Sequence, residues 1–299
     1  MTIAVAISTR DRPQALQRCL ESLGAGRLRP DEVIVADQSD GSETSRIADE
    51  VKASGLLSIR YLRARPGGLG AAQNDAIGAT SSEIVAVLDD DCVADGRWLQ
   101  EIAHAFEGDP ELALIAGRVL PLGPPSLDTY PVSSRLSAEP RAFVGKSLPW
   151  DVGSGNNFAV RRVWFERIGG CDERLGPGAP LRGGLDMDLF YRLLRAGGGA
   201  RYDPSVLVLH ERATREGRLS RRPAYGFGMA AAIAIWLRDG DRFAWTVLAA
   251  WLRMRSSLLL RGLAKGRWQT VHEEALVLWG TLQGLVRGFL TTRREQPTR

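Results

Sequence analysis

Cysteine is scarce in this sequence of 299 residues, which contains only Cys19, Cys92 and Cys171. Three cysteines without a Cys-x-x-Cys spacing exclude a disulfide framework and a cysteine-based zinc cluster, and they favour a reducing cytosol. The apolar stretch at the N-terminus is short and follows no basic residues, so it does not indicate a signal peptide. The sequence also lacks internal repeats and low-complexity tracts. We therefore expect a folded, cytoplasmic protein.

Hydrophobic residues make up 44% of the chain and charged residues 25%, as in an ordinary globular protein. The charge is unevenly distributed. Residues 1–210 hold 23 Lys and Arg against 28 Asp and Glu, a net charge of −5, whereas residues 211–299 hold 16 against 7, a net charge of +9. We expect a main domain over residues 1–215 and a basic, amphipathic helical region over residues 216–299.

Long hydrophobic runs are also missing from the basic region. Its two apolar runs, residues 227–237 and 243–252, are well short of the roughly 20 residues that a membrane-spanning helix needs. Arginine, lysine and tryptophan flank or interrupt these runs, which is typical of helices that lie on an anionic membrane surface. We expect such peripheral contact; the alternative is a helical hairpin packed on the main domain or on a second subunit. The sequence does not predict the oligomeric state.

Short apolar runs alternate with helical patterns in the first hundred residues. This alternation predicts an α/β fold with a mostly parallel central sheet and helices on both faces. The expected strands are residues 3–7, 32–36, 59–62 and 84–88, and the expected helices are residues 13–23, 42–55 and 70–78. We expect the proline-rich residues 120–149 to be irregular.

Three consecutive carboxylates follow the fourth expected strand. Asp89, Asp90 and Asp91 come directly after a buried apolar run, and adjacent like charges repel. Ligands of open α/β sheets bind beyond the carboxyl ends of the strands, where a cation would offset this repulsion. We expect a metal site here; the alternative is a solvated loop.

Polar residues also follow the first two expected strands. Thr9, Arg10 and Asp11 come after the first strand and Asp37 ends the second, so a nucleotide is the natural occupant of this edge. The glycine-rich run at residues 65–75 invites comparison with a dinucleotide-binding fingerprint. Its third glycine is replaced by Gln73, and it follows the third strand instead of the first, which argues against a dehydrogenase.

Six stretches of this sequence, in order and spacing, resemble the family 2 glycosyltransferases. They are VAISTRDRPQALQRCLESL, EVIVADQSDGS, GGLGAAQNDAI, VAVLDDDCVADGRWL, GSGNNFAVRRVWFERIGGCDERLG and GGLDMDLFYRLLRAGG, and the match covers about residues 1–212. The resemblance implies the GT-A fold, with a C-terminal α-helical appendage in this chain. It also implies inverting sugar transfer from a nucleotide-diphosphate sugar, with Mn²⁺ or Mg²⁺ held by an Asp-x-Asp motif.

The same resemblance assigns roles to individual residues. Asp89 and Asp91 match the Asp-x-Asp motif, in which the last carboxylate binds the metal and the first lies near the ribose. His210 matches a position near the metal or the diphosphate; the alternative is a structural histidine. The positions that match the nucleotide site are Thr9, Arg10, Asp11 and Asp37, and Asp186 resembles the general base. His104 and His272 receive no role.

The sequence departs from the family pattern beside the expected base. The usual Glu-Asp pair is Leu185-Asp186, which leaves Asp188 as an alternative base or as a helix-capping residue. Asn156 and Asn157 are candidates to contact the sugar, with a plain turn as the alternative. Trp150 is a candidate to stack on an acceptor ring, with ordinary packing as the alternative.

The expected chemistry requires two acidic sites with different duties. A metal held by carboxylates stabilises the leaving diphosphate, and a separate carboxylate takes the proton of the attacking hydroxyl. The expected partners are a nucleotide-diphosphate sugar and a carbohydrate or lipid-linked acceptor, without nucleic acid, in polysaccharide or glycolipid synthesis at the inner face of the plasma membrane. The alternatives are a nucleotidyltransferase and an inactive sugar-nucleotide-binding module. Against the former, no glycine-rich basic loop follows the first strand.

Overall fold

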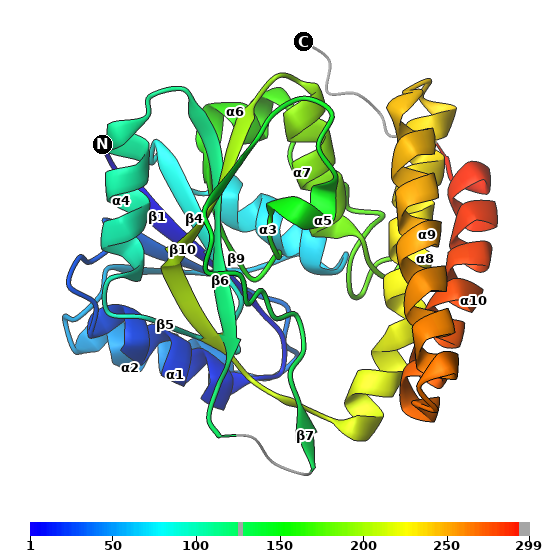
Figure 1. The fold of residues 1–299 in the computed structure, drawn as a ribbon. Helices are drawn as coiled ribbons and strands as arrows, with labels where there is room; N and C mark the ends of the chain where they lie inside the picture. Colours follow the sequence, from blue (N-terminus) through cyan, green and yellow to red (C-terminus); the bar gives the residue numbers. More distant parts are fainter. Residues whose placement is uncertain (125–127, 293–299) are drawn as a thin grey trace.

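The computed structural model describes residues 1–124 and 128–292. It has a central sheet covered by helices and a separate layer of three C-terminal helices (Figure 1). The predicted α/β class with a C-terminal helical region is confirmed. The four strands and three helices expected in the first hundred residues are present, with ends that differ by at most two residues.

The nine-stranded sheet is mixed, whereas the sequence predicted a mostly parallel one: its N-terminal strands are parallel, but β9, β5 and β8 pair antiparallel to their neighbours. Its order is β3-β2-β1-β4-β9-β6-β10-β5, with β8 paired to β10. Neighbouring strands β3, β2, β1 and β4 are parallel, whereas β9 is antiparallel to both β4 and β6. The strands are β1 (Ile3–Thr9), β2 (Glu32–Asp37), β3 (Ile59–Arg63), β4 (Ile84–Leu88), β5 (Cys92–Ala94), β6 (Leu112–Pro121), β8 (Arg141–Phe143), β9 (Asn157–Arg161) and β10 (Gly199–His210).

Both faces of this sheet are buried, which explains the uninterrupted apolar runs of its inner strands. In β4, Val85 and Val87 join the core on one face, and Ile84 and Leu88 join the core on the other. The first core includes residues of α3 (Leu69–Gly78), α6 (Arg162–Arg167) and α7 (Leu185–Arg195). The second includes residues of α1 (Pro13–Gly24), α2 (Glu43–Ala53) and α4 (Trp98–Gly108).

The segment over residues 120–149 is largely irregular, as expected, but it contributes short strands. Its residues 125–127 lie outside the described residues. Strand β8 extends the sheet, and β7 (Thr129–Tyr130) pairs with β11 (Ala213–Thr214), just before the C-terminal helices. The short helix α5 (Pro149–Val152) then leads toward β9.

The C-terminal layer consists of α8 (Arg215–Arg238), α9 (Phe243–Ala264) and α10 (Trp268–Leu290). Glycines let α8 and α10 approach closely. A Cβ on Gly280 or Gly284 of α10 would lie 2.1 Å from a backbone carbonyl oxygen of α8. On the side facing the sheet domain, Gly228 of α8 packs against Gly183. Among the described residues, no helix combines the length and the apolar character needed to cross a membrane.

Helix α8 differs from the amphipathic helix expected for the basic region. Every residue from 226 to 236 is buried, so this half of the helix has no solvent-facing side. The reason is its position between two partners, with the sheet domain on one side and α10 on the other. The apolar run at 227–237 therefore forms the core between the two parts of the molecule.

Candidate active site and metal centre

The three consecutive carboxylates lie at the carboxyl end of β4, beside the end of β1. Because these strands are parallel neighbours, the residues that follow each strand meet at one edge of the sheet. The Thr9 hydroxyl donates a hydrogen bond to Asp90 Oδ2 at 2.7 Å, and both side chains are buried. This contact joins two of the predicted strand-end segments.

Arg12 is a cation of this site that the sequence analysis did not single out. Its Nη1 donates to Asp90 Oδ1 at 3.1 Å and to Asp91 Oδ2 at 2.8 Å. Burial alone would lower the pKa of Arg12, but Asp90 and Asp91 raise it above its ordinary value. Arg12 directly precedes the helix-initiating Pro13, in the same stretch as Thr9, Arg10 and Asp11; this position was its only sequence signal.

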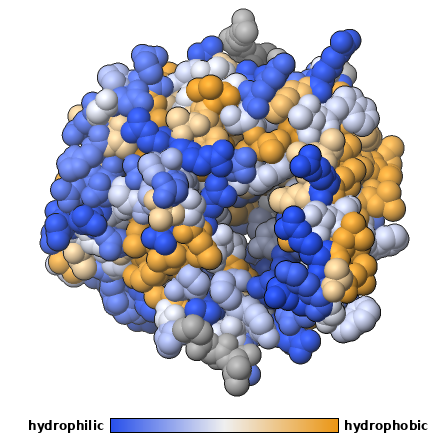
Figure 2. Space-filling model, in the orientation of Figure 1, coloured by the Kyte–Doolittle hydropathy of each residue, from blue (hydrophilic) through white to orange (hydrophobic). Residues whose placement is uncertain are grey.

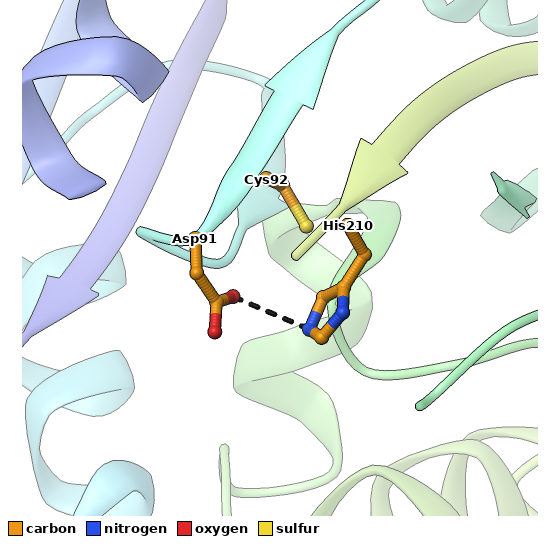
Figure 3. Close-up of side chains that lie close together, drawn as sticks. All are labelled: Asp91, Cys92 and His210. Carbon is orange, nitrogen blue, oxygen red and sulfur yellow. Dashed lines mark ion pairs between the residues drawn. The ribbon is translucent and has the colours of Figure 1, made fainter. Parts of the chain in front are cut away.

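His210 reaches the carboxylates through antiparallel pairing of β10 with β5. In this register His210 lies opposite Cys92, the residue that follows Asp91 in the sequence. His210 Nε2 lies 3.3 Å from Asp91 Oδ1, and Figure 3 shows this imidazole facing the carboxylate, with the Cys92 side chain close to both. One potential ligand atom from each of these three residues lies within 4.8 Å of the others. The structure therefore brings together the predicted metal ligands Asp91 and His210.

Several buried polar atoms of this cluster are left without hydrogen bonds. Among the described residues, Asp91 Oδ1, His210 Nδ1 and both amide atoms of Asn156 have no hydrogen-bond partner. Buried polar atoms without partners are costly and often mark a ligand site. Carboxylate oxygens suit Mn²⁺ and Mg²⁺, and a neutral imidazole nitrogen is a common metal ligand. Burial raises the pKa of the Cys92 thiol well above its ordinary value, which makes that thiol a poor ligand.

The site carries more negative charge than its own cations offset. Burial raises the pKa of Asp89, and the nearby Asp91 raises it further. Burial also raises the pKa of Asp90 to about 6, against the opposing effect of Arg12. Asp91 differs, because His210 and Arg12 outweigh its burial and lower its pKa. The carboxylates of this site thus fit an additional cation.

Asp186 lies close to this cluster, in the first turn of α7. Its Oδ2 accepts a hydrogen bond from the backbone N–H of Gly155 at 2.9 Å, one residue before Asn156. Burial raises the pKa of Asp186, although the Gly155 bond opposes the shift. Its charge contributes to the raised pKa of Asp89, so the two carboxylates interact electrostatically. Within residues 1–124 and 128–292, Asp186 thus has no cationic partner, and it lies beside the predicted metal site.

Asp188 has a different environment, although it is only two residues away. Its carboxylate accepts hydrogen bonds from Arg192 Nε at 2.7 Å and from the Trp236 indole of α8 at 2.8 Å. The Trp236 ring also stacks on Tyr191 at 3.7 Å. Asp188 is 1% exposed and joins α7 to the C-terminal helices. This environment favours a structural role over that of the alternative base.

The predicted nucleotide-binding residues divide into exposed and buried groups. Arg10 and Asp11 are exposed at the tip of the β1 loop, where their side chains lie 3.6 Å apart. Asp37 is fully buried at the end of β2, and it accepts hydrogen bonds from Ser39 and from the Tyr61 hydroxyl. The carboxylate of Asp37 is therefore held by protein groups.

Two of the predicted sugar-contacting residues are engaged elsewhere. The Asn157 amide is fully buried and hydrogen-bonds Trp98, Arg118 and Val206 at 2.8 to 3.0 Å. The ring of Trp150 packs against Trp251 of α9 at 5.7 Å. These contacts favour the structural alternatives for Asn157 and Trp150. The buried side-chain amide of Asn156, by contrast, has no hydrogen-bond partner among the described residues, and the Asn156 carbonyl oxygen accepts from the Asp89 N–H. His104 and His272 are exposed on α4 and α10.

A cavity lined by arginines and carboxylates adjoins the predicted metal ligands. It has a volume of about 240 Å³, and Asp91 and His210 form part of its wall. Three arginines line it as well: Arg12, Arg212 and Arg221, the last from α8. Figure 2 shows the surface hollowed between the sheet domain and the helical layer. A space that combines carboxylates, an imidazole and guanidinium groups suits an anion together with a metal ion.

Comparison with known proteins identifies relatives of this chain. Residues 4–169, more than half of the chain, match the family model described as "Glycosyl transferase family 2". The chain is 30% identical over 271 residues to a "Pre-mycofactocin glycosyltransferase" of Mycobacterium tuberculosis, a match that covers 89% of this chain and 54% of that protein. It is 26% identical to a "Chondroitin synthase" of Escherichia coli, over 70% of this chain and 34% of that protein. The chain thus spans about half the length, or less, of these curated relatives.

Solved structures share its fold. A mannosyltransferase of Pyrobaculum calidifontis in complex with GDP-Man and Mn²⁺ has a TM-score of 0.65 and 16% identity, covering 95% of this chain and 86% of that one. Residues 1–349 of S. aureus TarS in complex with UDP give a TM-score of 0.61 and 15% identity, with coverages of 97% and 89%. The GT-A fold expected from the sequence is confirmed.

Proposed function

Because the chain belongs to glycosyl transferase family 2, we propose that it transfers a sugar from a nucleotide-diphosphate sugar to an acceptor hydroxyl, with inversion and with a divalent metal. The observation that carries this proposal is the presence of two distinct acidic positions at one edge of the sheet. Asp91 lies beside His210, and Asp186 is held by Gly155 without a cationic partner. Metal binding and proton abstraction need this division of carboxylates.

Asp89, Asp91 and His210 are the proposed holders of Mn²⁺ or Mg²⁺. Support comes from His210 Nδ1, which has no hydrogen-bond partner among the described residues, from the contact of Asp91 Oδ1 with His210 Nε2, and from the raised pKa of Asp89. When bound, the metal would stabilise negative charge on the leaving diphosphate as a Lewis acid. Arg12, Arg212 and Arg221 would bind the remaining phosphate oxygens, because all three line the adjoining cavity.

Asp186 is the proposed general base. A carboxylate with a raised pKa is a stronger proton acceptor than an ordinary one, provided that it is ionised when the acceptor binds. The Gly155 N–H donates a hydrogen bond to Oδ2 and orients the side chain, whose carboxylate would take the proton of the acceptor hydroxyl. Attack from this side, opposite the leaving diphosphate, would invert the configuration of the transferred sugar. Asn156 is the proposed contact to that sugar, since its carbonyl oxygen accepts from the Asp89 N–H and the preceding Gly155 bonds Asp186.

The nucleotide is proposed to lie along the ends of β1 and β2. Thr9, Arg10 and Asp11 would line it, and Asp37 would shape its base site through Ser39 and Tyr61. For the acceptor, we propose a carbohydrate or a lipid-linked glycan in polysaccharide or glycolipid synthesis at the inner face of the membrane. The relatives' names, a pre-mycofactocin glycosyltransferase and a chondroitin synthase, support a carbohydrate-linked product.

The direct test uses the purified chain with a panel of UDP- and GDP-sugars, with Mn²⁺ or with chelator. Slow donor hydrolysis that requires the metal, and that Asp91→Ala removes, is the expected result. A family member without catalysis would bind a donor without consuming it, and a nucleotidyltransferase would release pyrophosphate from a nucleoside triphosphate and a sugar phosphate. Either of these results would contradict the proposal.

A further inference from the structure

We propose that the outward face shared by α9 and α10 binds the surface of a lipid bilayer that contains anionic lipids. This binding would not require the proposed sugar transfer, and it specifies which part of the basic region contacts the membrane. Its basis is an exposed apolar face combined with charge of one sign.

Exposed apolar side chains are concentrated on these two helices. Of the 17 large hydrophobic side chains exposed among the described residues, ten belong to α9 and α10. On α10, Trp279, Leu282, Val286 and Phe289 follow at steps of three and four residues, so they share one side of the helix. Figure 2 shows hydrophobic residues gathered along the edge of the molecule where these helices lie. An apolar face of this kind marks an interaction surface.

The face of α9 adds to the same surface. Trp245, Leu252 and Leu263 are 62%, 37% and 45% exposed, and steps of seven and eleven residues place them on one side of that helix. Helices α9 and α10 lie side by side in the C-terminal layer (Figure 1). Exposed tryptophans are typical of protein surfaces at the level of lipid headgroups, because the indole has an apolar ring and one N–H donor.

All the exposed charges of α9, α10 and the loop between them are positive. Residues 243–292 contain two carboxylates, Glu273 and Glu274, and both are 4% exposed. Glu273 pairs with Arg218 at 2.9 Å and with Arg222, and Glu274 lies 3.4 Å from Arg255. The exposed charged side chains of these residues are Arg253, Arg261, Lys265, Arg267 and Arg287.

This charge selects an anionic bilayer over a second copy of the chain as the occupant. A symmetric dimer through this face would oppose two surfaces of the same positive sign, which is unfavourable. An anionic bilayer supplies the opposite charge to the arginines and an apolar boundary to the side chains of the face. The helices would lie on the membrane, since no described helix is long and apolar enough to cross it.

The experiment is co-sedimentation of the full chain with vesicles of phosphatidylcholine alone or mixed with phosphatidylglycerol, at low and high salt. The wild type is expected to bind the mixed vesicles at low salt and to dissociate at high salt. Trp279→Glu with Leu282→Glu should weaken binding about tenfold or more, because charge replaces apolar contact. Arg261→Gln with Arg267→Gln should weaken it by a similar factor, since each cation near the surface contributes about fivefold.

Matched controls lie on exposed positions outside α9 and α10. Val144→Glu with Val163→Glu introduces the same charges at apolar side chains that are 71% and 63% exposed. Arg27→Gln with Arg29→Gln removes the same number of exposed cations from a loop of the sheet domain. Both control pairs should bind vesicles as the wild type does.

Three outcomes would overturn the proposal. The first is failure of the wild type to bind the mixed vesicles at low salt. The second is unchanged binding by both face variants. The third is a wild-type dimer in solution that dissociates with Trp279→Glu and does not bind vesicles, which would assign the face to a second copy. Donor hydrolysis by the same variants is measured separately, so failure here is distinguishable from failure of the proposed transfer.

Discussion

Two groups of buried carboxylates lie in different parts of this molecule, and they differ in charge balance. At the sheet edge, Asp89, Asp90 and Asp91 face two cationic or basic side chains, Arg12 and His210. In the helical layer, Glu273 and Glu274 are fewer than the three arginines that pair with them. Among the described residues, Asp91 Oδ1 and His210 Nδ1 of the first group have no hydrogen bond, whereas in the second group the atoms without one are the Nε atoms of Arg222 and Arg255 and not the glutamate oxygens.

The pKa shifts follow the same division. Burial raises the pKa of Asp90 to about 6 despite Arg12, whereas Arg218 and Arg222 overcome burial and lower the pKa of Glu273. A carboxylate that enough arginines neutralise stabilises packing and has no further need of a ligand. Carboxylates that stay under-compensated gain most from an external cation, and this difference separates the proposed active site from a structural ion-pair network.

The largest expected effect is that of Asp91→Ala, which tests the under-compensated group directly. Activity should fall to background, because the carboxylate that contacts both Arg12 and His210 is lost from the proposed metal site. Initial rates of sugar transfer or donor hydrolysis with saturating Mn²⁺ measure this effect. The control is Asp90→Asn, since Thr9 and Arg12 already occupy the Asp90 oxygens. Near-normal activity of Asp91→Ala would contradict the proposed functional difference between the sheet-edge carboxylates and the glutamates of the helical layer.

The next largest effect is expected at Asp186 of α7, and Asp188 of the same helix provides the comparison. Asp186→Asn should lower kcat by about 10² to 10⁴, the usual contribution of a general base, while donor affinity stays near that of the wild type. Asp188→Asn should instead lower thermal stability, because Arg192 loses its buried ionic partner. Steady-state kinetics and thermal unfolding of both variants separate the roles. The reverse pattern, with Asp188→Asn inactive and Asp186→Asn active, would show that the base lies at Asp188.

A smaller effect is expected in the neutralised group. Glu273→Gln should lower the free energy of unfolding by about 1–3 kcal/mol, because Arg218 and Arg222 lose their charged partner in a mostly buried position. Urea unfolding followed by circular dichroism gives this value, with the exposed Glu107→Gln of α4 as the matched control. Donor hydrolysis should stay within a few-fold of the wild type. A strong loss of Mn²⁺ binding in Glu273→Gln would be inconsistent with its structural role.

The smallest effect is a pH dependence of stability in metal-free protein. Raised pKa values mean that the folded state binds protons at Asp89, Asp90 and His210 more tightly than the unfolded state does. The free energy of unfolding should therefore rise as the pH falls from about 8 toward about 5.5. This range lies above the ordinary carboxylate pKa of about 4, so the carboxylates of the unfolded chain bind few protons there. Glu273, with a lowered pKa, loses its contribution only at lower pH, as the pH falls through that pKa.

Thermal unfolding across this pH range in the presence of chelator measures the effect. Asp90→Asn should flatten the curve, since it removes a carboxylate with a pKa of about 6. A melting temperature that stays level or falls between pH 8 and 5.5 would show that the sheet-edge carboxylates are already neutralised.

Local sequence patterns predicted much of the fold. Strands β1 and β4 are mostly apolar runs because both faces of the sheet are buried, and each run ends at polar residues that form the site. The helical layer was harder to predict, because the burial of residues 226–236 depends on glycines of α10 more than fifty residues later. An apolar run alone does not distinguish a membrane-facing helix from one buried on all sides.

The sequence predicted which residues form the site better than it predicted the contacts among them. The motif positions of Asp91 and His210 are more than a hundred residues apart, and only the β5–β10 register places them together. Arg12 was missed because an arginine before a helix is ordinarily solvated. The candidates Asn157 and Asp188 have partners, Trp98 and Trp236, on elements distant in sequence, so their structural contacts were not visible in the motifs.

The most direct test of the under-compensated carboxylates as a metal site is Mn²⁺ binding, measured by electron paramagnetic resonance with and without nucleoside diphosphate. We predict one protein-bound Mn²⁺ per chain in the wild type and in Glu273→Gln when the nucleotide is present, and at least tenfold weaker binding in Asp91→Ala. Equal Mn²⁺ binding by Asp91→Ala and the wild type, or no bound Mn²⁺ in any of the three proteins, would contradict the account.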